Sequence, residues 1–330
     1  MTRDPSTSPH QAPGARSCGQ RLHQIIVRPL VQGLQFCLLA GVLIRLSVKD
    51  SQHFIGLIYY ALPLPVLMTG SLLAMLLAWS RQRWKTGMFW MAMAGLLIPW
   101  WIQHDWKSAR QPEPAGHMPA VTVMFWNVAR QSNLEPALQL IRQTRPQILG
   151  LAELTGSPRE RSNKLKQQLP DYDVSILGSN LYLLIQGTSG TTETLEMGGS
   201  SVARRIPVHL QGHDLDIVVV DIDSHLARPR RPAIQHLAEF ARSRQAKPVL
   251  IMGDFNLPAD SVHFRFLQES FRQLFASAGQ GYAPTWPVPV PLLELDQIWI
   301  SAGLKPVSCR HLWSWASDHR PVLGTVEFTE

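Results

Sequence analysis

Two short segments near the C-terminal end carry the side chains best suited to chemistry. They read Gly253-Asp254-Phe255-Asn256 and Ser317-Asp318-His319-Arg320-Pro321. Each sets a carboxylate near an amide or imidazole group and beside a Gly or Pro, which restricts the local backbone. Phosphoester hydrolysis needs such groups, because water requires a base, a metal requires oxygen ligands and a phosphoryl oxygen requires hydrogen-bond donors. The remaining chain must supply the elements that bring the two segments together.

The positive charge of the chain belongs to its N-terminal third. The net charge of +7 would by itself suggest a nucleic-acid partner. Residues 1–118, however, hold 11 Lys and Arg against 4 Asp and Glu, whereas residues 119–330 hold 20 of each kind. The part that carries the two segments is therefore neutral and gives no electrostatic reason to expect DNA binding. The three cysteines lie far apart and predict neither a disulfide framework nor a metal site.

Three apolar stretches, at residues 29–44, 54–79 and 87–102, predict a membrane anchor of about three transmembrane helices. The middle stretch has 26 residues without an ionisable side chain, more than the roughly 20 that cross a bilayer, and its two prolines should bend it. For each of the 16-residue stretches the alternative is a buried or interfacial helix. We therefore expect a tail and anchor over 1–104, a linker over 105–118 and a separate domain over 119–330.

Loop charges give the anchor an orientation. Arg81, Arg83 and Lys85 lie between the second and third stretches, and four arginines lie within residues 1–28. By the positive-inside rule the N-terminus and this loop are cytoplasmic, which places the C-terminal domain on the extracytoplasmic side. If the first stretch does not span, the predicted orientation reverses.

The pattern changes after Ala120 to short apolar strands that alternate with helices, which predicts an α/β fold. Asn127, Glu153, Asp254, Asn256 and Asp318 each follow an apolar run or lie in a turn-rich segment. Rigid scaffolds present functional groups at such positions, so we expect these side chains to converge on one rim. The expected elements are strands at 121–126, 147–151, 182–185, 215–222, 249–252 and 297–300, and helices at 133–144, 233–242 and 263–275.

Five segments in this order resemble the endonuclease/exonuclease/phosphatase superfamily of metal-dependent phosphoesterases. They are residues 125–128 (FWNV), 151–154 (LAEL), 253–256 (GDFN), 295–299 (LDQIW) and 317–321 (SDHRP). The superfamily includes deoxyribonuclease I-like nucleases, inositol polyphosphate 5-phosphatases and neutral sphingomyelinases. The resemblance covers about residues 119–330. It implies a four-layer sandwich of two mixed β-sheets flanked by helices, and a divalent cation that is usually Mg²⁺, with Mn²⁺ as the alternative.

The resemblance also implies a metal site. Glu153 matches the principal metal ligand, which suits Mg²⁺ because this ion prefers one or two carboxylates with water and substrate oxygens. Asn127 matches the first-strand Asn close to both metal and phosphate, and Asp318 is implied to be a second carboxylate near the metal.

The same resemblance implies the catalytic roles. Asp254 matches the residue that orients or deprotonates the attacking water, and Asn256 matches the amide that stabilises the developing oxyanion. His319 is similar to the histidine that contacts the scissile phosphate, with Asp296 hydrogen-bonded to it. Asn127, Asn256 and His319 are thus the implied contacts to the substrate phosphate.

One strand departs from the family pattern. In the family the strand that corresponds to 215–222 leads to a His or Tyr directed at the phosphate, and here Asp223 takes that place. Either His225 substitutes for it, or Arg228, Arg230 and Arg231 supply the positive charge. A solvated loop is the third interpretation of this arginine cluster.

A tryptophan lies upstream of the Asp296 segment, in Thr285-Trp286-Pro287. It is interpreted either as packing that supports the rim or as a substrate contact.

Taken together, the sequence predicts a membrane-anchored, divalent-metal-dependent phosphoesterase that hydrolyses a phosphodiester or phosphomonoester by in-line attack of activated water. Its expected partners are the lipid bilayer and a phosphate ester, either a phospholipid headgroup or nucleic acid. The alternative is a catalytically reduced phosphate-binding or sensor protein of the same fold.

Overall fold

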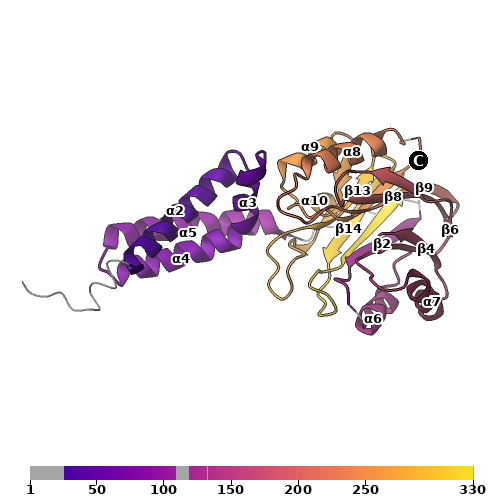
Figure 1. Ribbon diagram of the computed structural model, residues 1–330, viewed down its shortest axis with the longest axis horizontal. Coiled ribbons are helices and arrows are strands. Elements are labelled where there is room, and N and C mark those ends of the chain that lie inside the picture. The colour runs from indigo at the N-terminus through magenta and orange to yellow at the C-terminus, as the bar shows by residue number, and fades with distance from the viewer. Residues whose placement is uncertain (1–25, 109–118, 132, 245, 330) are drawn as a thin grey trace, which may run out of the picture.

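A bundle of helices packs to one side of a two-sheet domain (Figure 1). The computed structural model describes residues 26–108, 119–131, 133–244 and 246–329, so the predicted tail and most of the predicted linker lie outside the described residues. The bundle consists of α2 (Arg28–Leu46), α3 (His53–Ala61), α4 (Leu64–Trp79) and α5 (Trp84–Asp105). Buried apolar side chains of α2, α4 and α5 form its core.

The bundle contains fewer candidate membrane spans than the sequence predicts. By length and composition, α2 is the one described helix that could cross a membrane, and a second candidate arises only if α3 and α4 count as one span. The expected middle span is broken between these helices, which meet at 64°, at Leu62 and Pro63. The third stretch forms α5, whose four tryptophans and polar C-terminal end lower its mean hydropathy. The expectation of about three transmembrane helices was therefore wrong.

The first sheet of the domain has six strands. Its order is β14-β15-β2-β3-β5-β4, and only the β2–β3 pair is parallel. The strands are β2 (Ala120–Asn127), β3 (Ile148–Ala152), β4 (Asp173–Gly178), β5 (Leu181–Ile185), β14 (Leu304–His311) and β15 (Val322–Phe328).

The second sheet has seven strands and is also mixed. Its order is β11-β13-β10-β9-β8-β6, with β7 paired to β8, and β9 runs parallel to β10. The strands are β6 (Thr188–Ser189), β7 (Glu193–Glu196), β8 (Val202–Leu210), β9 (His213–Asp221), β10 (Val249–Asp254), β11 (Phe271–Gln273) and β13 (Asp296–Ser301).

The sheets pack face to face with helices on both outer faces, which confirms the predicted α/β fold with mixed sheets and flanking helices. In β2, Val123 and Phe125 face the core between the sheets, whereas Met124 and Trp126 face the outer helices. Both faces of the strand are buried, which explains its nearly continuous apolar sequence. The six-stranded sheet is covered by α6 (Glu135–Thr144) and α7 (Pro158–Gln168), and the seven-stranded sheet by α8 (Arg231–Arg242), η2 (Val262–Phe264) and α9 (Arg265–Gln268).

The helix expected over residues 263–275 is wrong. Phe264, Leu267, Phe271 and Leu274 have helical spacing, but the chain forms η2, α9, β11 and then α10 (Leu274–Ala278). Strand β11 pairs with β13 at the edge of the second sheet, so a tertiary contact overrides the local pattern.

Polar contacts attach the bundle to the loop that follows β10. Arg45 Nη1 lies 3.2 Å from Asp260 Oδ2, and His104 Nε2 lies 3.2 Å from the same oxygen. Asp50 accepts hydrogen bonds from the Val262 amide and the Ser261 hydroxyl. In addition β1 (Trp106–Lys107), within the predicted linker, pairs with β12 (Gly281–Tyr282). The bundle therefore contacts the same loop that begins with the GDFN segment.

Candidate active site

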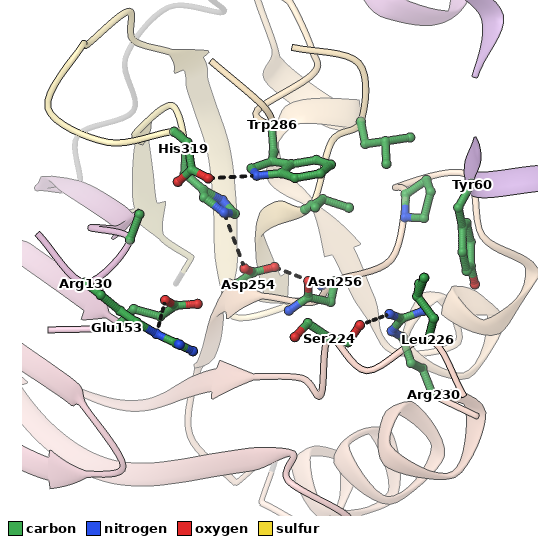
Figure 2. A pocket seen from close by; sticks show the side chains of 15 residues that line it. Tyr60, Arg130, Glu153, Ser224, Leu226, Arg230, Asp254, Asn256, Trp286 and His319 are labelled. Carbon is green, nitrogen blue, oxygen red and sulfur yellow. Dashed lines mark hydrogen bonds and ion pairs between the residues drawn. The ribbon is translucent and has the colours of Figure 1, made fainter. Parts of the chain in front are cut away.

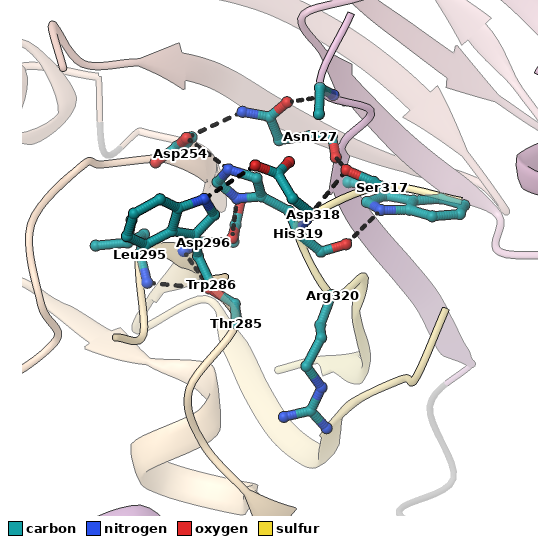
Figure 3. Close-up of polar contacts among 12 residues, drawn as sticks. Asn127, Asp254, Thr285, Trp286, Leu295, Asp296, Ser317, Asp318, His319 and Arg320 are labelled. Carbon is teal, nitrogen blue, oxygen red and sulfur yellow. Dashed lines mark hydrogen bonds and ion pairs between the residues drawn. The ribbon is translucent and has the colours of Figure 1, made fainter. Parts of the chain in front are cut away.

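The ends of four strands bring polar residues of both sheets together. Asn127 ends β2 and Glu153 follows β3, while Asp254 ends β10 and is the direct cross-strand partner of Asp296 in β13. The Asn127 side-chain nitrogen donates to Asp254 Oδ2 at 3.0 Å (Figure 3). The same nitrogen donates to Glu153 Oε1 at 3.3 Å. One amide thus joins the two sheets and aligns both carboxylates.

The backbone of the GDFN segment is fitted to its neighbours. A Cβ on Gly253 would lie 2.1 Å from the Val220 carbonyl oxygen, so only glycine allows this approach between β9 and β10. Asn256 has a φ of 50°, a left-handed conformation that Asn tolerates. The backbone N–H of Asn256 donates to Asp254 Oδ1. One N–H of its side-chain amide donates to the Ile222 carbonyl oxygen. The second side-chain N–H of Asn256 stays available to a ligand.

The SDHRP segment is tied to the end of β2. The Ser317 hydroxyl donates to the Asn127 carbonyl at 2.8 Å and accepts from the His319 backbone N–H at 3.1 Å. The Trp126 indole donates to the His319 carbonyl at 2.9 Å. These contacts fix the backbone from which the His319 ring projects toward Asp254 (Figure 3).

His319 lies between two buried carboxylates. Its Nδ1 is 2.8 Å from Asp296 Oδ2, and its Nε2 is 3.9 Å from Asp254 Oδ2. Burial opposes the charged ring, but Asp296 and then Asp254 outweigh burial and raise the pKa of His319 above its usual range. Burial and the negative charge of Asp296 raise the pKa of Asp254. The predicted pairing of His319 with Asp296 is therefore present in the structure.

The contacts of the Thr285-Trp286 segment bear on both interpretations of Trp286. The Thr285 hydroxyl accepts hydrogen bonds from the backbone N–H groups of Leu295 and Asp296, which fixes the start of β13. The Trp286 indole donates to Asp318 Oδ2 at 3.1 Å, and its ring lines the cavity (Figure 2). Trp286 both supports the rim and faces the space that a substrate would enter.

A further carboxylate, which the sequence interpretation missed, lies at the end of β9. Asp221 pairs across the strands with Asp254. Burial, followed by the charges of Asp254 and Glu153, raises its pKa to about 7. Arg130 counters this charge, with its Nε 2.9 Å from Glu153 Oε2. The end of a strand was the available signal, but it directed attention to Asp223, two positions further along.

The site opens into a cavity of about 430 Å³. Of the predicted residues, Glu153, Asp254, Asn256, Asp318 and His319 line it, while Asn127 and Asp296 lie buried behind them. The other lining residues are Tyr60, Ala129, Arg130, Ser224, Leu226, Arg230, Pro258, Trp286, Leu293 and Leu295.

The structure does not bring His225 or Arg228 to the wall of this cavity. Arg228 instead pairs with Asp223 at 2.7 Å and donates to the Ser200 hydroxyl. The Asp223 carboxylate also accepts the His225 backbone N–H. Of the three clustered arginines, Arg230 is the one among the lining residues.

A family model described as the endonuclease/exonuclease/phosphatase family matches residues 124–319, well over half of the chain. The chain belongs to this family. Proteins of the endonuclease/exonuclease/phosphatase family include hydrolases that act on phosphoester bonds.

Comparison with individual proteins extends the similarity. An uncharacterized protein, YbhP of Escherichia coli K12, is 29% identical over 127 residues, which cover 37% of this chain and 50% of YbhP. The matched region thus spans about half the length of the curated relatives. Among solved structures, humanized D. rerio TDP2 superposes with a TM-score of 0.54 at 14% identity, covering 63% of this chain and 99% of that one. A family member from Bacteroides vulgatus gives a TM-score of 0.54 at 17% identity and covers 64% and 100%.

Enzymes of the endonuclease/exonuclease/phosphatase family depend on a divalent metal, and the residues of this site fit one. Glu153, Asp254 and Asp221 lie close enough together that the charges of the first two raise the pKa of Asp221, with Arg130 as the nearby counter-charge. A divalent cation with oxygen ligands would neutralise such a cluster. Asp254, Asp296 and His319 also form a buried group with ligand atoms within 4.8 Å of one another. Because both ring nitrogens of His319 face carboxylates, this second group suits proton handling better than metal binding.

Proposed function

We propose that this chain is a membrane-anchored, Mg²⁺-dependent phosphoesterase that hydrolyses a phosphodiester or phosphomonoester by in-line attack of water. The gathering of Asp254, Asn256, His319 and Glu153 at the wall of one cavity supports this proposal. Water activation, oxyanion stabilisation and a metal carboxylate are the three functions that phosphoryl transfer to water requires.

The roles follow from the contacts. Asp254 accepts a proton from the attacking water, and its raised pKa makes it a better base near neutral pH. Protonated His319, held by Asp296, and the second side-chain N–H of Asn256 stabilise the charge that develops on the phosphoryl oxygens. Asn127 keeps Asp254 and Glu153 aligned through its amide.

Glu153 is the principal metal ligand in this proposal, and Asp318 is the second carboxylate at the cavity wall. The Asn127 oxygen accepts the Ala129 backbone N–H at 2.8 Å, so Asn127 serves here to position the ligands. Bound Mg²⁺ supplies Lewis-acid polarisation of a phosphoryl oxygen and stabilises the leaving group.

The exposed apolar surface of the helical bundle supports the membrane anchor. Leu30, Phe36, Phe54 and Leu96 are 67%, 73%, 80% and 71% exposed, and most exposed large hydrophobic side chains belong to the bundle. Soluble monomers rarely expose so many large apolar side chains on one unit, and lipid would cover them. The extracytoplasmic orientation of the catalytic domain additionally requires α5 to cross the bilayer, for which its 22 residues are long enough although its hydropathy is lower than that of α2; the arginine-rich loop after α4 would then stay cytoplasmic.

The substrate is either a phospholipid headgroup or a nucleic acid. The equal numbers of acidic and basic residues over 119–330 favour the former, because nucleases use positive charge to bind phosphate backbones. A D. rerio TDP2 structure holds a single-strand DNA product, which keeps nucleic acid among the substrates to be tested.

A substrate panel on the full chain in detergent tests the proposal. Sphingomyelin, phosphatidylinositol phosphates, plasmid DNA, RNA and bis-p-nitrophenyl phosphate are incubated with Mg²⁺ and, in parallel, with EDTA. We expect hydrolysis of at least one substrate with Mg²⁺ and none with EDTA.

Asp254→Asn should lower kcat by about 10² or more, the usual contribution of a general base. Asp214→Asn, at an exposed position of β9, is the matched control. Full activity in Asp254→Asn, or an intact panel throughout, would refute the mechanism.

A further inference from the structure

The cavity extends beyond the catalytic groups to a second end that the mechanism does not use. Figure 2 shows Glu153 and Arg130 on one side of Asp254 and Asn256, and Tyr60 and Arg230 on the other side. Tyr60 belongs to α3 of the helical bundle, whereas Arg230 directly precedes α8 of the catalytic domain. This second end is therefore built across the boundary between the two units.

Arg230 is a buried cation that forms no ion pair within the described part of the chain. It is only 8% exposed, its Nε donates to the Asp223 carbonyl at 3.0 Å, and its Nη2 donates to the Ser224 carbonyl at 2.9 Å. Among the described residues no carboxylate lies within 4.0 Å of its guanidinium nitrogens. A buried charge without a partner is costly. An anion bound in the cavity would offset that cost, because the planar guanidinium can donate several hydrogen bonds to it.

The neighbouring arginines differ from Arg230 in this respect. Arg228 is already paired with the Asp223 carboxylate and is half exposed. Arg231 is exposed on α8, and its guanidinium lies over the Phe266 ring. Neither side chain lines the cavity that contains Asp254 and His319.

Tyr60 holds Arg230 in place. The guanidinium carbon lies 5.5 Å from the centroid of the Tyr60 ring, a cation–π distance. The Tyr60 hydroxyl donates to Asp50 at 2.9 Å, and Asp50 in turn accepts the Val262 backbone N–H of the loop after β10. The aromatic wall and the cation are thus fixed by the contact between bundle and domain, with Leu226 and Pro258 completing the surface.

We propose that the Arg230–Tyr60 end of the cavity binds a second anionic group of the substrate while the scissile phosphate lies at Asp254 and His319. The inference rests on the proposed phosphoesterase activity and narrows its substrate class. The preferred substrate is a phosphoester that carries another phosphate or carboxylate, which either a nucleotide or an anionic lipid headgroup can provide.

Two matched substrate pairs test this subsite. They also show whether a nucleotide or a lipid headgroup supplies the second anionic group. The nucleotide pair is thymidine 5′-(p-nitrophenyl phosphate) with and without a 3′-phosphate, and the lipid pair is phosphatidylglycerol phosphate and phosphatidylglycerol in detergent micelles. The readout is the ratio of kcat/KM within each pair for the full chain, Arg230→Gln, Arg230→Lys and the control Arg231→Gln. We expect the doubly anionic member to be preferred in one pair. Arg230→Gln should reduce that preference by about tenfold to a hundredfold, as for a lost charge-assisted hydrogen bond.

Arg230→Lys keeps the charge without the planar fork, so its preference should be intermediate, and Arg231→Gln should match the unmodified chain. Calorimetry in EDTA, with thymidine 3′,5′-bisphosphate against thymidine 5′-monophosphate, measures the subsite without turnover. There the bisphosphate should bind more tightly to the unmodified chain, and the difference should disappear in Arg230→Gln. Equal kcat/KM within both pairs, or an unchanged ratio in Arg230→Gln, overturns the subsite. If no substrate is hydrolysed with Mg²⁺, the proposed function fails, and the calorimetric difference alone decides the subsite.

Discussion

At the scale of single residues, the site depends on carboxylates that the fold removes from water. Asp254 and Asp296 are almost completely buried, and His319 lies between them. Burial alone would neutralise each group, but together they hold a charged imidazole next to a base of raised pKa. This arrangement makes the protonation state of His319 depend most on Asp296 and next on Asp254.

Replacing that neighbour should change the pH dependence of activity. Asp296 raises the pKa of His319 against the effect of burial. In Asp296→Asn burial acts without that opposition, so the pKa of His319 falls and its proton is lost at lower pH. We expect the alkaline limb of the kcat/KM profile to move to lower pH by about one unit or more, measured with bis-p-nitrophenyl phosphate and Mg²⁺. Asp214→Asn should leave the limb in place. If the alkaline limb does not move in Asp296→Asn, then loss of the His319 proton is not what lowers kcat/KM at high pH.

At the scale of elements, the strands and the five motif segments were predictable because their signals are local. Continuous apolar runs indicate strands buried on both faces, and polar residues after them mark the rim. Tyr60 was not predictable as a cavity residue, since its neighbour Arg230 lies far along the chain. Helix 263–275 was misread because apolar spacing alone does not reveal the pairing of β11 with β13. In both cases a contact between residues far apart in the sequence determines the structure, and the local pattern does not reveal it.

The contact between α5 and the loop after β10 should weaken as pH rises. Burial opposes the charged form of His104, but hydrogen bonds to Asp105 and Asp260 outweigh it and raise its pKa to about 9. The stabilisation is fully present below the unfolded value of 6.5 and is lost as pH rises through about 9. Discounted for the 34% exposure of the side chain, it amounts to about 1–2 kcal/mol.

Melting temperatures in detergent between pH 6 and pH 9.5 measure this effect. The unmodified chain should lose stability across the upper part of the range. His104→Gln should start lower and show a flatter dependence, whereas His236→Gln, exposed on α8, should follow the unmodified chain. Parallel curves for His104→Gln and the unmodified chain would show that the contact with Asp260 does not depend on the charge of His104.

At the scale of the whole molecule, the apolar surface and the catalytic groups lie in different parts of the chain. The bundle presents apolar side chains and belongs to the N-terminal third, which carries the excess positive charge. The domain is neutral and carries the catalytic groups. The cavity lies where they meet, because Tyr60 of α3 lines it together with Asp254. A bilayer around the bundle would thus hold the cavity close to the lipid surface. This placement favours headgroup substrates over polymers that must reach the site from solution.

The proposed orientation can be measured by labelling single cysteines in intact spheroplasts of Escherichia coli. Gln82→Cys lies in the arginine-rich loop between α4 and α5, and Arg159→Cys is exposed on α7 of the catalytic domain. Both are made in a chain without Cys18 and Cys37, and the remaining Cys309 is buried. Since positive loops stay cytoplasmic, a membrane-impermeant maleimide should label Arg159→Cys before lysis and Gln82→Cys only afterwards. The reverse pattern would place the domain in the cytoplasm. Labelling of both positions before lysis would mean that α5 does not cross the membrane.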